Sequence, residues 1–278
     1  MKIKAEHLVL AVGVLAVSFA AIFIRSADAH PTVIAMMRMS IGAIVMTTAW
    51  CFGRRVLPSR QDLPWLFASG LFLSLHFISW IASFSYTSIA SSVVLASTQP
   101  IFALVLAHFM FKEEVTVSKV VGISICLGGA VIVSLSDIQI GGSSMMYGNL
   151  LAIGGAVFGA LYFLAGKKLR STLPLDTYTS FVYSISAIIL WAVVLVNKLP
   201  LGPFSPTTWY SFFGLGLICT VIGHSSFNYA IGYLPAGIVS ISLLGEPIGA
   251  AILGSLLLKE YPSGGQIIGG IITLAGII

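Results

Sequence analysis

One acidic residue lies inside a long apolar segment. Glu246 is followed by Pro247 in the run 236–258, which holds no other charged residue. The same helix and proline pattern occurs earlier, where Gln99 precedes Pro100 inside 89–111. A carboxyl group deep in hydrocarbon is costly, and an ionisable residue there is a functional-site candidate by default. The repeated break, with an acid at one copy, is typical of a transporter.

The composition places these residues in a membrane. Hydrophobic residues make up 58% of the 278 positions and charged residues 8%, and the mean hydropathy is +1.03. A water-soluble fold of this length would need a charged surface. We therefore expect an all-α integral membrane protein with ten helices, each near the roughly 20 residues that cross a bilayer core. The predicted spans are 8–24, 31–52, 64–86, 89–111, 117–135, 147–166, 176–196, 207–231, 236–258 and 264–278.

Basic residues predict the orientation, because short cytoplasmic loops carry an excess of Lys and Arg. With the N-terminus inside, ten of the fourteen basic residues fall on the inner side: Lys2, Lys4, Arg54, Arg55, Arg60, Lys112, Lys119, Lys167, Lys168 and Arg170. The net charge of +5 thus reflects topology and not a nucleic-acid surface. We expect a multi-pass protein of the cytoplasmic (inner) membrane with both termini in the cytoplasm.

The chain contains an internal repeat. A shift of 147 residues, the separation of Gln99 from Glu246, also aligns three further landmarks: Lys112-Glu113 with Lys259-Glu260, Gly122 with Gly269, and Gly129 with Gly276. A shift of 142 places 150–167 over 8–25. We predict a first repeat at 1–135, an outer linker at 136–147 and a second repeat at 148–278. Five spans per half is an odd number, so the two repeats must be inverted, with the substrate site near the midplane where they meet.

These features resemble the ten-helix EamA-type permeases of the drug/metabolite transporter superfamily, over essentially the whole chain. The most specific landmarks are an arginine in Met36-Met37-Arg38-Met39-Ser40, the blocks from Pro100 to Glu113 and from Pro247 to Glu260, and the glycine-rich helix after each block. The resemblance implies an export or exchange carrier for small organic solutes, with helices 1 to 4 and 6 to 9 around a central cavity. It implies that helices 5 and 10 are peripheral, where we expect a homodimer contact. The superfamily is too varied to name a substrate.

Helical spacing predicts the candidate site, since residues three, four or seven apart share one face. Polar and aromatic stripes of this kind occur in four spans. With Tyr162, they give ten predicted substrate-binding residues: His76, Trp80, Ser83, Ser92, Gln99, Tyr162, His224, Asn228, Ser242 and Glu246. Each has a structural alternative. Serines can bond to their own helix, histidines can bond between helices, and a tryptophan can anchor at the interface.

Six charged or breaking positions have open roles. Glu246 could carry a proton, balance a cationic substrate, or be structural. Arg38 lies about 10 Å inside the outer end of its span at 1.5 Å per residue. We favour structural pairing, with snorkelling or a substrate carboxylate as alternatives. Structural or gating roles are expected for Arg38, Pro100, Pro247, Glu113 and Glu260.

The sequence favours a secondary carrier that works by alternating access. An ATP-driven pump needs a phosphate-binding loop, and a membrane enzyme needs a catalytic constellation such as HExxH or GxSxG, and neither occurs. We expect no enzyme activity, no cofactor and no metal, since the three cysteines lack ligand spacing. Trp80, Phe77, Tyr162, Tyr183 and Phe227 suit an amphipathic metabolite such as a neutral or aromatic amino acid. The alternative is a small cation, such as a quaternary amine, opposite Glu246; a channel or membrane enzyme is the weakest hypothesis.

Overall fold

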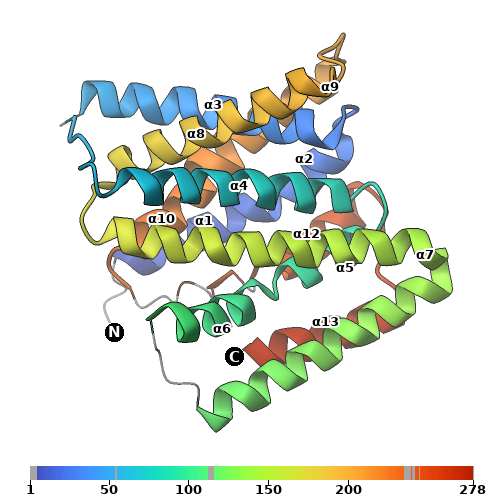
Figure 1. The fold of residues 1–278 in the computed structure, drawn as a ribbon. Coiled ribbons are helices and arrows are strands. Elements are labelled where there is room, and N and C mark those ends of the chain that lie inside the picture. Colours follow the sequence, from blue (N-terminus) through green and yellow to red (C-terminus); the bar gives the residue numbers. More distant parts are fainter. Residues whose placement is uncertain are drawn as a thin grey trace.

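The computed structural model describes residues 5–53, 55–111, 116–234, 239, 242–243 and 245–277. Every regular element in these ranges is a helix, and most run side by side in one direction or its reverse (Figure 1). The elements are α1 Ala5–Ser18, α2 Ala20–Ser26, α3 Pro31–Phe52, α4 Leu63–Ser83, α5 Ile89–Ala96, α6 Gln99–Phe111, α7 Val117–Arg170, α8 Leu175–Val196, α9 Pro206–Phe213, the π-helix η1 Gly214–His224, α10 Ser225–Ala230, α12 Gly245–Leu257 and α13 Gly264–Ile277.

Ten apolar segments account for this architecture. Eight described helices are long and apolar enough to cross a membrane, and two shorter apolar helices, Gly245–Leu257 and Gly264–Gly276, complete the set. A helix needs about 20 apolar residues to cross a bilayer core. The eight long helices are near or above this length, and the two short ones are below it. The predicted all-α membrane fold is therefore confirmed.

The predicted break at the first proline is present. The span 89–111 is divided into α5 and α6 at Ser97 and Thr98, immediately before Pro100. Proline has no N–H to donate and disfavours helical geometry in the residue before it, and the turn closes through a bond from the Thr98 N–H to the Leu95 carbonyl at 3.2 Å. Pro247 lies in the first turn of α12, as Pro100 does in α6, and proline is tolerated in the first turn of a helix.

The predicted spans 117–135 and 147–166 are too short at the two ends that adjoin the predicted linker. They run as Val120–Ile140 and Gly142–Arg170, so residues 136–147 are helical on both sides of a sharp bend at Gly142, with φ 63° and ψ −143°. Asp137, inside the predicted linker, is fully buried. Asp137 accepts hydrogen bonds from Ser91 Oγ, Asn149 Nδ2 and Gln266 Nε2 at 2.9, 2.7 and 2.7 Å, which satisfies the carboxylate within a helix.

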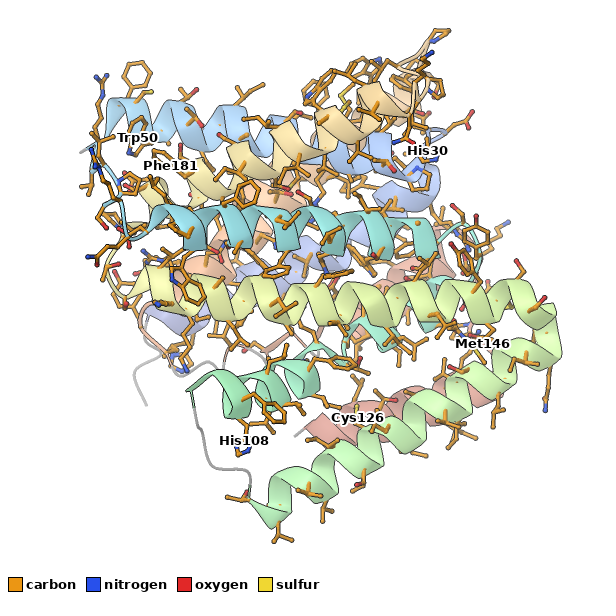
Figure 2. The ribbon with its side chains drawn as sticks, viewed as in Figure 1. His30, Trp50, His108, Cys126, Met146 and Phe181 are labelled. Carbon is orange, nitrogen blue, oxygen red and sulfur yellow. The ribbon has the colours of Figure 1, made fainter. Side chains whose placement is uncertain are left out.

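Equivalent helices of the two halves run in opposite directions. Trp50 near the end of α3 packs edge-to-face against Phe181 near the start of α8, with ring centroids 5.6 Å apart. Figure 2 shows this pair at one end of the molecule and His30 and Met146 at the other. α3 and α8 thus lie antiparallel, as inverted five-helix repeats require.

α13 and the first part of α7 lie together at one side of the bundle (Figure 1). They approach closely through glycine: a Cβ on Gly276 would lie 2.6 Å from the Gly122 carbonyl oxygen, and one on Gly129 would lie 2.6 Å from the Gly269 carbonyl oxygen. Only 28% of the Val120–Ile140 window is buried. These helices are peripheral, as expected, and dimerisation through them stays a prediction.

Candidate substrate cavity

A cavity lies between the two halves and is lined by eight residues from each. The lining residues are Val17, His76, Trp80, Val93, Ala96, Ser97, Gln99, Pro100, Gly159, Tyr162, Phe163, His224, Phe227, Asn228, Leu243 and Glu246. Its volume, counted as room for the centres of water molecules, is about 60 Å³. That is space for a few waters at about 10–15 Å³ each.

Many lining residues occupy equivalent positions in the two repeats. The 147-residue shift relates Gln99 to Glu246 and Ala96 to Leu243, and the 142-residue shift relates Val17 to Gly159. A shift of 148 residues pairs His76 with His224 and Trp80 with Asn228. The cavity therefore forms where corresponding surfaces of the inverted repeats meet, the position expected for a transporter site.

An aromatic wall forms one side of the cavity. Trp80 stacks on His76 with ring centroids 5.8 Å apart, and Phe77 meets His224 edge-on at 5.3 Å. His76 Nδ1 lies 2.8 Å from the Gly155 carbonyl oxygen. Because a carbonyl oxygen only accepts, Nδ1 donates and Nε2 is the acceptor of the neutral ring. Trp80 Nε1 is buried and has no hydrogen-bond partner, so this wall carries one unused donor.

A hydroxyl and amide network forms another part of the lining. The Tyr162 hydroxyl donates to Asn228 Oδ1 at 3.0 Å and lies 2.8 Å from Asn228 Nδ2. The same Nδ2 lies 3.3 Å from the Tyr183 hydroxyl, which is 3.2 Å from Ser225 Oγ. Arg170 Nε donates to the Asn228 carbonyl oxygen at 3.0 Å. Tyr162 and Asn228 line the cavity with their polar groups already engaged, so they shape it.

The acid of this site is open to the cavity. Glu246 is half-buried in the first turn of α12, and among the described residues it is the only Asp, Glu, Lys or Arg side chain in the lining. No described residue donates a hydrogen bond to its carboxyl. The predicted position of Glu246 at the meeting point of the repeats agrees with the structure.

Arg38 lies directly behind the aromatic wall and is fully buried, with 0% of its surface exposed. Its Nε donates to Thr220 Oγ1 at 2.8 Å, and its Cζ lies 4.1 Å from the centre of the Phe77 ring. Thr220 in turn donates to the Leu215 carbonyl five residues earlier, so the π-helix η1 places this hydroxyl. Arg38 does not snorkel outward. Its Nη1 and Nη2 atoms are buried without a hydrogen-bond partner.

Three predicted substrate-binding residues are not part of the cavity lining. Ser83 and Ser92 are fully buried, and their hydroxyl oxygens lie 2.6 Å apart. Ser83 also donates to the Trp80 carbonyl at 2.6 Å. These serines join α4 to α5 instead of facing the cavity. Ser242 is also absent from the lining.

The predicted structural or gating residues lie in different parts of the structure. Pro100 lines the cavity, whereas Pro247 is buried beside it in α12. Glu260 lies beyond the end of α12 and forms an ion pair with Arg25 at 3.2 Å. Lys112 and Glu113 lie outside the described residues. Sequence reasoning missed Ser97, Phe163 and Leu243, and only Ser97 carries a polar signal, two residues before Gln99.

The EamA-like transporter family matches residues 4–135 and 146–278, which is nearly the whole chain. The protein belongs to the EamA-like transporter family. Two proteins of Archaeoglobus fulgidus named as uncharacterized transporters are 29% and 27% identical; the matches cover 89% and 98% of this chain and 87% and 95% of those proteins. A protein of Streptantibioticus cattleyicolor named as a probable terminal-alkyne amino-acid exporter is 24% identical, over 80% of this chain and 74% of its own.

A solved crystal structure shares this fold at 18% identity. It superposes with a TM-score of 0.73 and covers 98% of this chain and 95% of its own. The matched family is a transporter family, and these relatives are named as transporters or as an exporter. This EamA protein is therefore a multi-pass membrane transporter.

Proposed function

We propose that this EamA protein is a secondary carrier that moves a small amphipathic metabolite, an amino acid or a related compound, by export or exchange. The observation that carries the proposal is the cavity where the inverted repeats meet, with His76 and Trp80 from one repeat and His224 and Glu246 from the other. The predicted location is the cytoplasmic membrane, with both termini in the cytoplasm.

The lining suits a solute with an apolar body and a polar end. Val93, Phe163, Phe227 and Leu243 offer apolar surface, while Trp80 Nε1 and the Glu246 carboxyl offer unused polar atoms. Small-molecule sites combine mostly apolar walls with a few polar groups that fix orientation. The relative named as an amino-acid exporter supports the same class of solute.

The small volume of the cavity supports alternating access. The space for the centres of water molecules is about 60 Å³, so the helices around it would separate further when a larger solute enters. Rocking of one repeat against the other would open the cavity to each side in turn.

The alternative substrate is a small organic cation. Glu246 is the one carboxyl in the described lining, and Trp80 stacked on His76 offers an aromatic face of the kind that binds quaternary ammonium groups. The same carboxyl could carry the coupling proton.

The test is counterflow in proteoliposomes that contain the purified protein. Vesicles are preloaded with one compound from a panel of neutral and aromatic amino acids, quaternary amines and nucleosides, and uptake of the labelled compound is followed. Trp80→Ala should reduce uptake of the accepted compound at least tenfold, whereas Trp191→Ala, on the exposed face of α8, should leave it unchanged. Counterflow of quaternary amines alone would favour the alternative, and counterflow of nucleosides alone would contradict both.

A further inference from the structure

A buried arginine and a half-buried glutamate lie in one region of this molecule without pairing. Arg38 packs behind the aromatic wall of the cavity and Glu246 lines the cavity, but no nitrogen to oxygen distance between them is within 4.0 Å, since the single ion pair in the described part of the chain joins Arg25 and Glu260. The guanidinium has two unused nitrogens, and no described donor reaches the carboxyl.

This arrangement is costly as it stands. An arginine side chain remains charged in proteins, and a buried charge without a hydrogen-bonded partner is strongly destabilising. Thr220 satisfies one nitrogen of Arg38, and the Phe77 ring faces the guanidinium carbon. Two donors remain, and they point to a ligand that supplies acceptors.

The position of Arg38 allows a ligand in the cavity to reach it. Its guanidinium carbon lies 4.1 Å from the centre of the Phe77 ring. The Phe77 ring in turn meets the ring of His224, which lines the cavity, with ring centroids 5.3 Å apart. Rotation of these two side chains, as the cavity widens to admit a substrate, would bring the two nitrogens into the site.

We propose that Arg38 and Glu246 form one binding site for a zwitterion, in which the guanidinium binds the carboxylate and Glu246 binds the ammonium group of an α-amino acid. This inference rests on the proposed function and narrows its substrate class. A planar guanidinium with two free nitrogens matches a carboxylate bidentately. Both charged groups of the protein then gain partners, and the occupied site stays electrically neutral.

Single-charged ligands fit this site less well. An amine would engage Glu246 and leave Arg38 unpaired, while a carboxylic acid would engage Arg38 and leave Glu246 unpaired. A site built to pair a charged group rejects the analogue that lacks it, because its own buried group is left without a partner. An α-amino acid should therefore bind more tightly than the corresponding amine and than the corresponding carboxylic acid.

The experiment compares matched ligands on the full-length purified protein. The probes are L-phenylalanine and L-leucine, the amines phenethylamine and isoamylamine that lack the carboxylate, and the acids 3-phenylpropionate and 4-methylpentanoate that lack the ammonium group. Ligand-induced thermal stabilisation gives the apparent affinity of each. We expect at least tenfold tighter binding of one of the amino acids than of its amine and of its acid.

Substitutions of Arg38 and Glu246 test which side chain binds each charged group of the amino acid. Arg38→Gln should bring an amino acid and its amine to equal affinity, and Glu246→Gln should do the same for the amino acid and its acid. Arg38→Lys, which keeps the charge, should retain part of the preference for the amino acid over the amine. If Arg38→Gln does not fold, the ligand series on the unaltered protein still decides the question.

The outcomes separate this inference from the proposed function. Equal binding of an amino acid and its amine would overturn the zwitterion site while leaving an amphipathic carrier intact. Absence of binding and of counterflow for every amino acid and amine would overturn both.

Discussion

Arg25 at the end of α2 and Glu260 beyond α12 form an ion pair with Nε and Oε2 3.2 Å apart. Arg25 also donates to the carbonyls of Phe84 and Thr87, and Glu260 accepts from the Ile89 N–H. One contact thus joins helices of both repeats to the turn between α4 and α5. An isolated exposed ion pair contributes little, but this one is part of a hydrogen-bond network at one end of the bundle.

Neutralising this ion pair should open the cavity to that end. In a variant without the three native cysteines, Ser97→Cys places a reporter in the cavity lining. We expect Arg25→Gln to increase its labelling by a membrane-impermeant maleimide several-fold, because three helix ends lose their common partner. Lys198→Gln, in a different connecting segment, is the control and should not change the labelling rate. Equal rates in Arg25→Gln and the parent would show that closure does not depend on the pair.

Removing the Tyr162 hydroxyl should destabilise the protein. Tyr162→Phe leaves the buried Asn228 amide with fewer partners, and an unsatisfied buried polar group costs about 1–3 kcal/mol. We expect a drop of several degrees in the thermal unfolding midpoint. Tyr210→Phe removes the hydroxyl of an exposed tyrosine and should have no effect. A shift of the same size in both variants would contradict the role assigned to this network.

The serines outside the cavity should affect stability and not substrate affinity. Ser83→Ala and Ser92→Ala each leave one hydroxyl of the 2.6 Å pair without its partner, so the unfolding midpoint should fall. Neither side chain lines the cavity, so the KM for the transported substrate should stay within about twofold. A tenfold rise in KM would return these serines to the binding site.

The comparison of sequence with structure shows what spacing can predict. The stripes contain His76, Trp80, His224, Asn228 and Glu246, and all five line the cavity, because helical periodicity determines which residues share a face. Periodicity does not determine what faces them. Ser83 lies on the same stripe as Trp80, but Ser92 on the neighbouring α5 satisfies it.

Long-range partners account for the other differences. Asp137 gives its segment the appearance of a polar linker, and only the fold brings Ser91 and Gln266 to its carboxylate. The bonds of Arg38 likewise depend on Thr220, which lies 182 positions away in the chain. No local pattern encodes such a contact. The inverted repeat was predictable because its landmarks recur at a constant shift.

Glu246→Gln tests the proton-carrier role of this acid. If Glu246 carries the coupling proton, transport driven by an imposed pH gradient requires it. The variant should then lose gradient-driven accumulation while retaining counterflow at saturating substrate, which needs no net proton movement and offsets the weaker binding. Both activities are measured in the same proteoliposomes. Glu260→Gln, which removes an acid outside the cavity, should retain the response to the gradient. Accumulation that persists in Glu246→Gln would remove the proton-carrier role and leave substrate binding as the function of this carboxyl.

The bend at Gly142 offers a direct test of the helical hairpin. Its φ of 63° and ψ of −143° lie where residues with a Cβ are strained by about 1–3 kcal/mol. No atom lies within 4 Å of a Cβ built there, so Gly142→Ala should lower the unfolding midpoint through backbone strain alone. Gly128 in the same helix has equally open surroundings but helical geometry, so Gly128→Ala should be neutral or stabilising. Equal midpoints for the two variants would place the bend elsewhere.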